Sequence, residues 1–179
     1  MLRLTFSRRL TAALVAALTL AVLSLAMASA GTSDLDRARA ATARFNSLNQ
    51  AAKAGYGLPP APAPLHECIA SFVAGEGAMG FHYLNGGLID ATLDPTKPEA
   101  LVYAPAANGE LRLVALEYVI FKSDWPSEHP PMLFGEMFME VPVPNRYLIP
   151  APFWALHAWV WEDNPAGTFA AFNPAVSCD

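Results

Sequence analysis

Apolar residues recur every three or four positions over residues 34–55, which predicts one amphipathic helix. Ser33 or Asp34 can cap its first turn, and Gly55 and Gly57 follow its last turn. This spacing places the apolar side chains on a single helix face that needs a packing partner. The residues on that face are Leu35, Ala38, Ala41, Phe45, Leu48 and Ala52.

A proline-rich segment separates this helix from the remainder of the chain. Residues 58–64 contain four prolines, which exclude both a helix and a central strand. We therefore expect an extended connector here, followed by a β-rich body over residues 67–179. Short apolar runs bounded by turn residues predict its strands, the clearest at 69–74, 79–84, 111–122 and 153–161.

One helix followed by a series of strands favours an α+β fold, with the N-terminal helix packed on an antiparallel sheet or small β-barrel. The chain from 125 to 152 carries seven prolines and predicts a long connection between strands. Connections of this length are uncommon without a role, so one interpretation is a lid or a flap over a pocket. The alternative is a structural loop whose Phe134, Met137 and Phe138 pack into the core.

The first thirty residues have the composition of a targeting segment. Three arginines precede an uncharged apolar run at residues 10–27, and a small-x-small cleavage pattern ends at Ala30. We expect a signal peptide at 1–30 and one globular domain at 31–179, exported to the periplasm or the extracellular space and not bound to a membrane after cleavage. Because the apolar run is close to the length of a membrane span, an uncleaved anchor is the alternative.

Cysteine usage agrees with export. The chain has two cysteines, Cys68 and Cys178, and such a pair in an exported protein predicts a disulfide. Two free thiols or a redox pair are the alternatives, but the cysteines lack the C-x-x-C spacing of redox motifs.

The charge balance excludes some partners. Sixteen acidic residues against eleven basic ones give a formal net charge of −5. An acidic surface argues against nucleic acid and anionic membranes as partners. A small molecule or a metal ion remains compatible with this composition.

Three ionisable residues lie among apolar neighbours on separate predicted strands. They are His82 within run 79–84, Glu117 within run 111–122 and His157 within run 153–161. Side chains alternate along a strand, so we expect Glu117 to share one face with Leu113, Ala115, Val119 and Phe121. A buried carboxylate is costly unless it is paired, hydrogen-bonded or bound to a metal ion.

Two imidazoles and one carboxylate form a common set of ligands for a divalent metal. Three protein ligands that leave one position open suit zinc or non-haem iron chemistry. We therefore hypothesise a zinc or iron site at His82, Glu117 and His157, with no catalytic residue assigned. The spacing contains no recognised metal motif, so a hydrogen-bonded triad without metal and three residues that never meet are the alternatives.

Two other functions are compatible with the sequence. Trp154, Trp159 and Trp161 could line an apolar pocket for a small ligand, although a tryptophan-rich strand is more often part of a core. The domain could also be structural or mediate interactions without any chemistry. No sequence feature separates these functions from metal binding.

Several segments resemble a family of uncharacterised bacterial exported proteins. The resembling motifs are MGxHY at 79–83, LEY at 116–118, LHxWxW at 156–161 and NPxG at 164–167. The resemblance extends over nearly all of residues 31–179 and implies an exported single-domain protein. It implies no activity, substrate or catalytic residue.

Overall fold

The computed structural model describes residues 34–60 and 64–179. The predicted signal peptide and residues 61–63 of the connector lie outside this part of the chain. Most of the described strands form one six-stranded antiparallel sheet in the order β1-β2-β3-β4-β8-β7. Its strands are β1 (Ile69–Ala70), β2 (Ala78–Leu84), β3 (Ala100–Pro105), β4 (Leu111–Phe121), β7 (Met139–Val141) and β8 (Phe153–Ala158).

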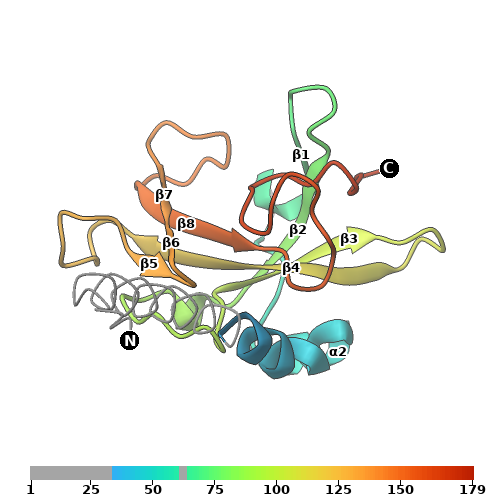
Figure 1. The fold of residues 1–179 in the computed structure, drawn as a ribbon, viewed down its shortest axis with the longest axis horizontal. Coiled ribbons are helices and arrows are strands. Elements are labelled where there is room, and N and C mark those ends of the chain that lie inside the picture. The colour runs from blue at the N-terminus through green and yellow to red at the C-terminus, as the bar shows by residue number, and fades with distance from the viewer. Residues whose placement is uncertain (1–33, 61–63) are drawn as a thin grey trace, which may run out of the picture.

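The sheet is curled. Helices cover one of its faces, and loops cover the other. Figure 1 shows the N-terminal helices on one side of the sheet and the C-terminal loops, in red, on the other. A two-stranded hairpin of β5 (Met132–Leu133) and β6 (Glu136–Met137) precedes β7. Two short 3-10 helices, η2 (Pro64–His66) and η3 (Gly86–Leu88), flank β1 and β2 in the chain. This arrangement agrees with the broad α+β prediction.

The helix predicted at 34–55 is interrupted. Residues 34–42 are α-helical, η1 (Ala43–Asn46) is a 3-10 helix, and α2 (Leu48–Lys53) resumes after an extended Ser47. The buried hydroxyl of Tyr103 on β3 donates to the Phe45 carbonyl at 2.6 Å. A continuous α-helix would pair that carbonyl within the helix, so this contact with the sheet replaces one helical hydrogen bond. The apolar periodicity of residues 34–55 could not predict this interruption of the helix.

The face that carries the helices forms the main hydrophobic core. Ala38, Phe45 and Ala51 from the helical segments pack against alternate residues of the central strands. Within this cluster the sheet contributes Leu101, Tyr103, Leu113, Leu116, Tyr118, Ile120, Trp154, Leu156 and Ala158. The side chains between these residues must therefore point to the opposite face, which we call the site face.

A β-bulge changes the expected alternation along β4. Val102 is opposite Ala115, but the next β3 residue, Tyr103, is opposite Leu113, so Val114 is an extra residue on β4. Leu113 consequently packs in the main core and does not share a face with Glu117 as the sequence suggested. The Val114 carbonyl accepts hydrogen bonds from the backbone of Trp161 and Glu162 beyond the end of β8, so the bulge keeps a hydrogen-bonding partner.

The C-terminal segment closes one end of the site face. Ala78 and Asn173 exchange backbone hydrogen bonds of 3.3 and 3.1 Å, which join this segment to β2. Val176 and Cys178 pack into an apolar cluster with Val102 and Ala115. A disulfide between Cys68 and Cys178 then joins the start of the β-rich body to its end, as predicted.

No helix within residues 34–60 and 64–179 combines the length and the apolar character needed to span a bilayer.

The disulfide closes a loop with a sequence separation of 110 residues. Loop closure of this size contributes roughly 4–5 kcal/mol through the entropy of the unfolded chain. Replacing both cysteines by serine should therefore lower the free energy of unfolding by several kcal/mol in a denaturant titration. Wild-type protein from an oxidising compartment should also show no alkylated cysteine in mass spectra without reductant. Two alkylated cysteines in that sample would contradict this pairing.

Candidate metal centre

The register of the sheet brings the three predicted ligands to one place on the site face. Glu117 on β4 lies directly opposite His157 on β8. His82 on β2 lies opposite Val102 of β3, and Ala100, two residues along β3, lies opposite Glu117. Residues two apart on a strand share a face, so all three ionisable side chains project from the same side of the sheet.

The small side chain of Ala100 allows His82 and Glu117 to meet. Strand β3 lies between their strands, so their backbones are separated by two strand spacings, or about 10 Å. Ala100 is fully buried opposite Glu117, and its methyl group leaves the space above β3 open to the longer side chains. The two head groups therefore approach each other over this residue.

Gly80 sets the direction of the neighbouring side chains on β2. Its φ is +118°, and a Cβ at this position would lie 2.4 Å from the Tyr103 carbonyl oxygen, so only glycine fits. This backbone interrupts the alternation of β2, and Met79 lines the same cavity as His82 although the two are three positions apart. A buried thioether is thus placed beside the candidate ligands.

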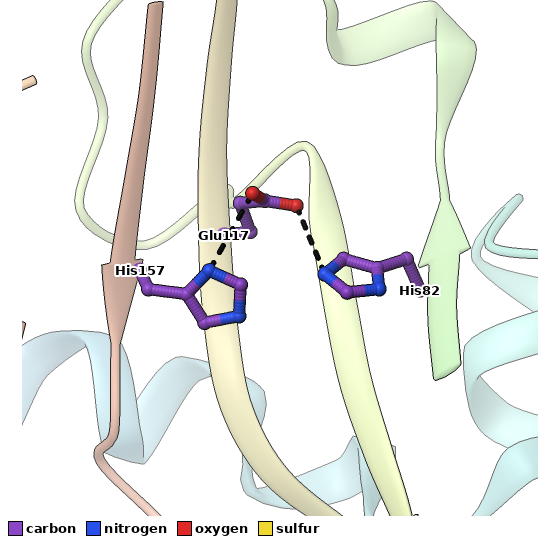
Figure 2. A group of neighbouring side chains, drawn as sticks. All are labelled: His82, Glu117 and His157. Carbon is purple, nitrogen blue, oxygen red and sulfur yellow. Dashed lines mark ion pairs between the residues drawn. The ribbon is translucent and has the colours of Figure 1, made fainter. Parts of the chain in front are cut away.

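The carboxylate of Glu117 lies between the two imidazole rings. One oxygen is 3.3 Å from His82 Nε2, and the other is 3.5 Å from His157 Nδ1 (Figure 2). One potential ligand atom from each of the three residues lies within 4.8 Å of the other two. The structure therefore brings together the set that the sequence suggested.

Burial and mutual charge determine the protonation of this group. The side chains of His82 and His157 are 2% and 3% exposed, and that of Glu117 is 15% exposed. Burial lowers the pKa of His82 to about 4 against the opposing effect of the Glu117 carboxylate. Burial raises the pKa of Glu117, but the two histidines outweigh that effect and lower it to about 2. At neutral pH the group therefore contains a carboxylate beside a neutral His82 ring.

The remaining ring nitrogens, His82 Nδ1 and His157 Nε2, are buried without a hydrogen-bond partner. The backbone of Gly80 lies close to the His82 ring and slightly raises the pKa of His82. Its geometry does not give His82 Nδ1 a hydrogen bond. Histidines that bind metal usually donate their second nitrogen to a carbonyl or a carboxylate. The described residues supply no such acceptor to either histidine.

Two cavities adjoin Glu117. The larger, of about 310 Å³, is lined by Glu117 and His157 together with apolar residues of β7 and β8 and the loops around them. The smaller, of about 30 Å³, is lined by His82, Glu117, Met79 and Tyr147 among others. Glu117 therefore connects a buried group of ligands to a space that can admit a small molecule.

The long connection at 125–152 contributes to the larger cavity. Glu136, Met137, Met139, Val141 and Tyr147 all line it, which agrees with the position expected of a lid. The same connection also packs into the protein, because Phe138 is buried in the main core and Phe134 contacts Tyr118 edge-on and stacks on Phe169. Met137, expected in the core under the structural alternative, is 64% exposed.

The tryptophans do not line either of these cavities, although the ring of Trp159 stacks on that of His157. Trp159 is buried, and its indole N–H donates to the Ala170 carbonyl. The indole N–H of Trp161 donates to the Thr42 hydroxyl on the helical side of the sheet. Apart from Glu117, Glu136 and the two histidines, the residues lining these cavities have Met, Phe, Tyr and aliphatic side chains. A tryptophan-lined pocket therefore stays a prediction.

Comparison of the chain with protein-family models, curated proteins and solved structures finds no match. The resemblance to uncharacterised exported proteins consequently stays a prediction. The chemistry of the site must be argued from its own geometry.

A second buried carboxylate, Glu99, immediately precedes β3 and was not predicted from the sequence. It is 4% exposed and accepts a 3.0 Å hydrogen bond from the Val119 backbone N–H. Burial, assisted by the charges of Asp90 and Glu117, raises its pKa to about 8. Glu99 lies in a polar stretch between Pro98 and Ala100, where no alternating pattern indicates burial.

This raised pKa predicts a pH dependence of stability. Between about pH 4.5 and 8 the folded state retains a proton on Glu99 that the unfolded state releases. The stabilisation that this proton provides is complete below that range and is lost as pH rises through it. The free energy of unfolding should therefore fall by up to about 1.4 kcal/mol per pH unit, the value for one bound proton. Glu99→Gln should flatten the slope in denaturant titrations across this range. The exposed Glu128→Gln is the control, and equal slopes in the two variants would contradict the assignment.

Proposed function

We propose that this protein is exported and binds a divalent transition-metal ion through His82, Glu117 and His157. The observation that carries the proposal is the convergence of these three groups, from three strands, to within 4.8 Å of one another on an otherwise apolar face. Buried ionisable groups of this kind are uncommon unless they are paired or coordinate a metal. Two imidazoles with one carboxylate suit zinc or iron.

The separations within the group are longer than those of short charge-assisted hydrogen bonds. Charge-assisted N–H to carboxylate bonds are typically about 2.7–2.9 Å long. The distances of 3.3 and 3.5 Å from Glu117 to the two rings exceed that range. Ligands at about 2.0–2.2 Å from one ion lie roughly 3.0–3.5 Å from each other in tetrahedral or octahedral geometry. The two contacts of Glu117 fall in this range, but they involve different carboxylate oxygens, and a set of one atom from each residue spans up to 4.8 Å. The three side chains would therefore have to close slightly to share one ion.

The protonation of the group also suits metal binding. Metal ions bind neutral imidazole and ionised carboxylate, which are the forms of His82 and Glu117 at neutral pH. Three protein ligands leave coordination positions free, and the 310 Å³ cavity at Glu117 and His157 can supply a water or a small molecule to them.

Export is part of this proposal for two reasons. The predicted signal peptide directs the chain out of the cytoplasm, and the Cys68–Cys178 disulfide is typical of proteins that function in oxidising compartments.

Binding of a small organic ligand is the second candidate function. The larger cavity lies at the lower end of the size range of small-molecule sites, and Val141, Phe153 and Ala155 give it apolar walls. Glu117 and His157 would then be polar contacts to the ligand. Wild-type protein that stays metal-free but is stabilised by a small organic ligand would favour this function.

Metal analysis of the purified, disulfide-intact protein tests the first proposal. After chelator treatment and incubation with Zn²⁺ or Co²⁺, the wild type should retain about one ion per chain in elemental analysis. His82→Ala and His157→Ala should lose this ion because each removes one of three ligands. Glu117→Gln, which changes volume little, should weaken binding without creating a cavity.

The matched control is His129→Ala, because His129 is exposed in the loop before β5. It should bind metal as the wild type does. Circular dichroism of each variant would separate loss of ligand from loss of fold. Wild-type protein that remains metal-free with each ion would overturn the proposal and leave a hydrogen-bonded triad.

A further inference from the structure

Methionine side chains flank the proposed metal centre on two sides. On β2, Met79 is 5% exposed and lines both cavities that Glu117 lines. Its Sδ atom lies 3.9 Å from the Tyr147 hydroxyl, which also lines both cavities. The thioether is thus oriented toward the space beside the candidate ligands and not into the helical core.

Two further methionines lie at the outer wall of the larger cavity. Met139 on β7 is opposite Ala155, which shares the site face with His157 two residues along β8. Met137 is two positions before Met139, and the residue between them, Phe138, is buried in the main core. Met137 and Met139 are 64% and 57% exposed, although both line the cavity. Solvent can therefore reach these two thioethers.

The donor atoms around the cavity are of two chemical classes. Imidazole nitrogen binds zinc, copper, iron and nickel, whereas thioether sulfur is a soft ligand that selects Cu(I). Copper is the metal that suits both classes. Leu or Val would pack equally well at these three positions, so apolar packing alone does not account for three methionines around one polar group.

We propose that the ion bound at this centre is copper, that Met79 supplies a thioether ligand to Cu(I), and that Met137 and Met139 form the outer soft ligands through which Cu(I) reaches it. This inference rests on the proposed metal centre but assigns to it copper, bound as monovalent Cu(I), in place of the divalent zinc or iron named above. It assigns a role to three residues that the His/Glu/His set leaves unused.

Anaerobic titration of disulfide-intact protein with Cu(I), in competition with a chromophoric Cu(I) chelator, tests this inference. Co²⁺ serves as the hard-ion comparison and Ag⁺ as a soft ion without redox chemistry. Met79→Leu conserves volume but removes the sulfur, so it should weaken Cu(I) and Ag⁺ binding about 10-fold or more and change Co²⁺ binding less than about threefold. Met132→Leu is the matched control, because Met132 is exposed on β5 and does not line either cavity.

Equal affinities of Met79→Leu and Met132→Leu for Cu(I) would overturn the inference. X-ray absorption of Cu(I)-loaded selenomethionine protein gives a second measurement that requires no variant. Selenium bound to copper is expected, and a shell of nitrogen and oxygen alone would contradict it.

The outcomes separate this inference from the proposed function. Wild type that binds Co²⁺ through His82 and His157 but shows no preference for Cu(I) or Ag⁺ keeps the metal centre and rejects copper. Cu(I) bound equally by wild type and His157→Ala would reject the His/Glu/His centre and keep the thioether ligand. Failure to bind Co²⁺, Cu(I) and Ag⁺ alike would reject both.

Discussion

The cost of burying the Glu117 carboxylate is the constraint on which the site face depends. Its side chain is 15% exposed at the centre of the sheet, between apolar clusters around Val102 and Val119. An isolated carboxylate in such surroundings would be protonated or would destabilise the fold. Two imidazoles instead lie on opposite sides of it and hold its pKa near 2, against the effect of burial. The strands that carry these imidazoles must therefore keep their register.

The two histidines reach Glu117 by different structural means. His157 is its direct cross-strand neighbour, which any antiparallel pairing of β4 with β8 in this register supplies. His82 lies two strands away and reaches it only because Ala100 leaves the space over β3 open. On β2, Gly80 approaches the Tyr103 carbonyl too closely for any side chain, and its backbone turns Met79 toward the same cavity. Small residues on β2 and β3 therefore matter as much to the site as its candidate ligands do.

The sequence predicted the components of the site better than their arrangement. Apolar runs located β2, β4 and β8, and ionisable residues inside those runs identified His82, Glu117 and His157. The bulge at Val114 and the break in the helix near Phe45 were not predicted, because both depend on hydrogen bonds from distant residues, Trp161 and Tyr103. Likewise, Glu99 has no apolar pattern around it, and its burial follows from a contact with Val119. Local periodicity carries no information about such long-range contacts.

The unpartnered nitrogens around Glu117 fit a hydrogen-bonded triad and a metal centre equally. In a triad, both rings donate to the carboxylate and leave unpaired acceptors at His82 Nδ1 and His157 Nε2. In a metal centre the same atoms are unpaired donors, so each interpretation carries a similar cost of burial. In a triad, the flexible Glu117 side chain could move toward either ring and shorten one hydrogen bond to about 2.8 Å. It instead lies between the rings with one oxygen toward each. One oxygen toward each ring is the arrangement of a carboxylate shared by two imidazoles, and the same side chains would enclose an ion only by bringing the three ligand atoms closer than their present 4.8 Å.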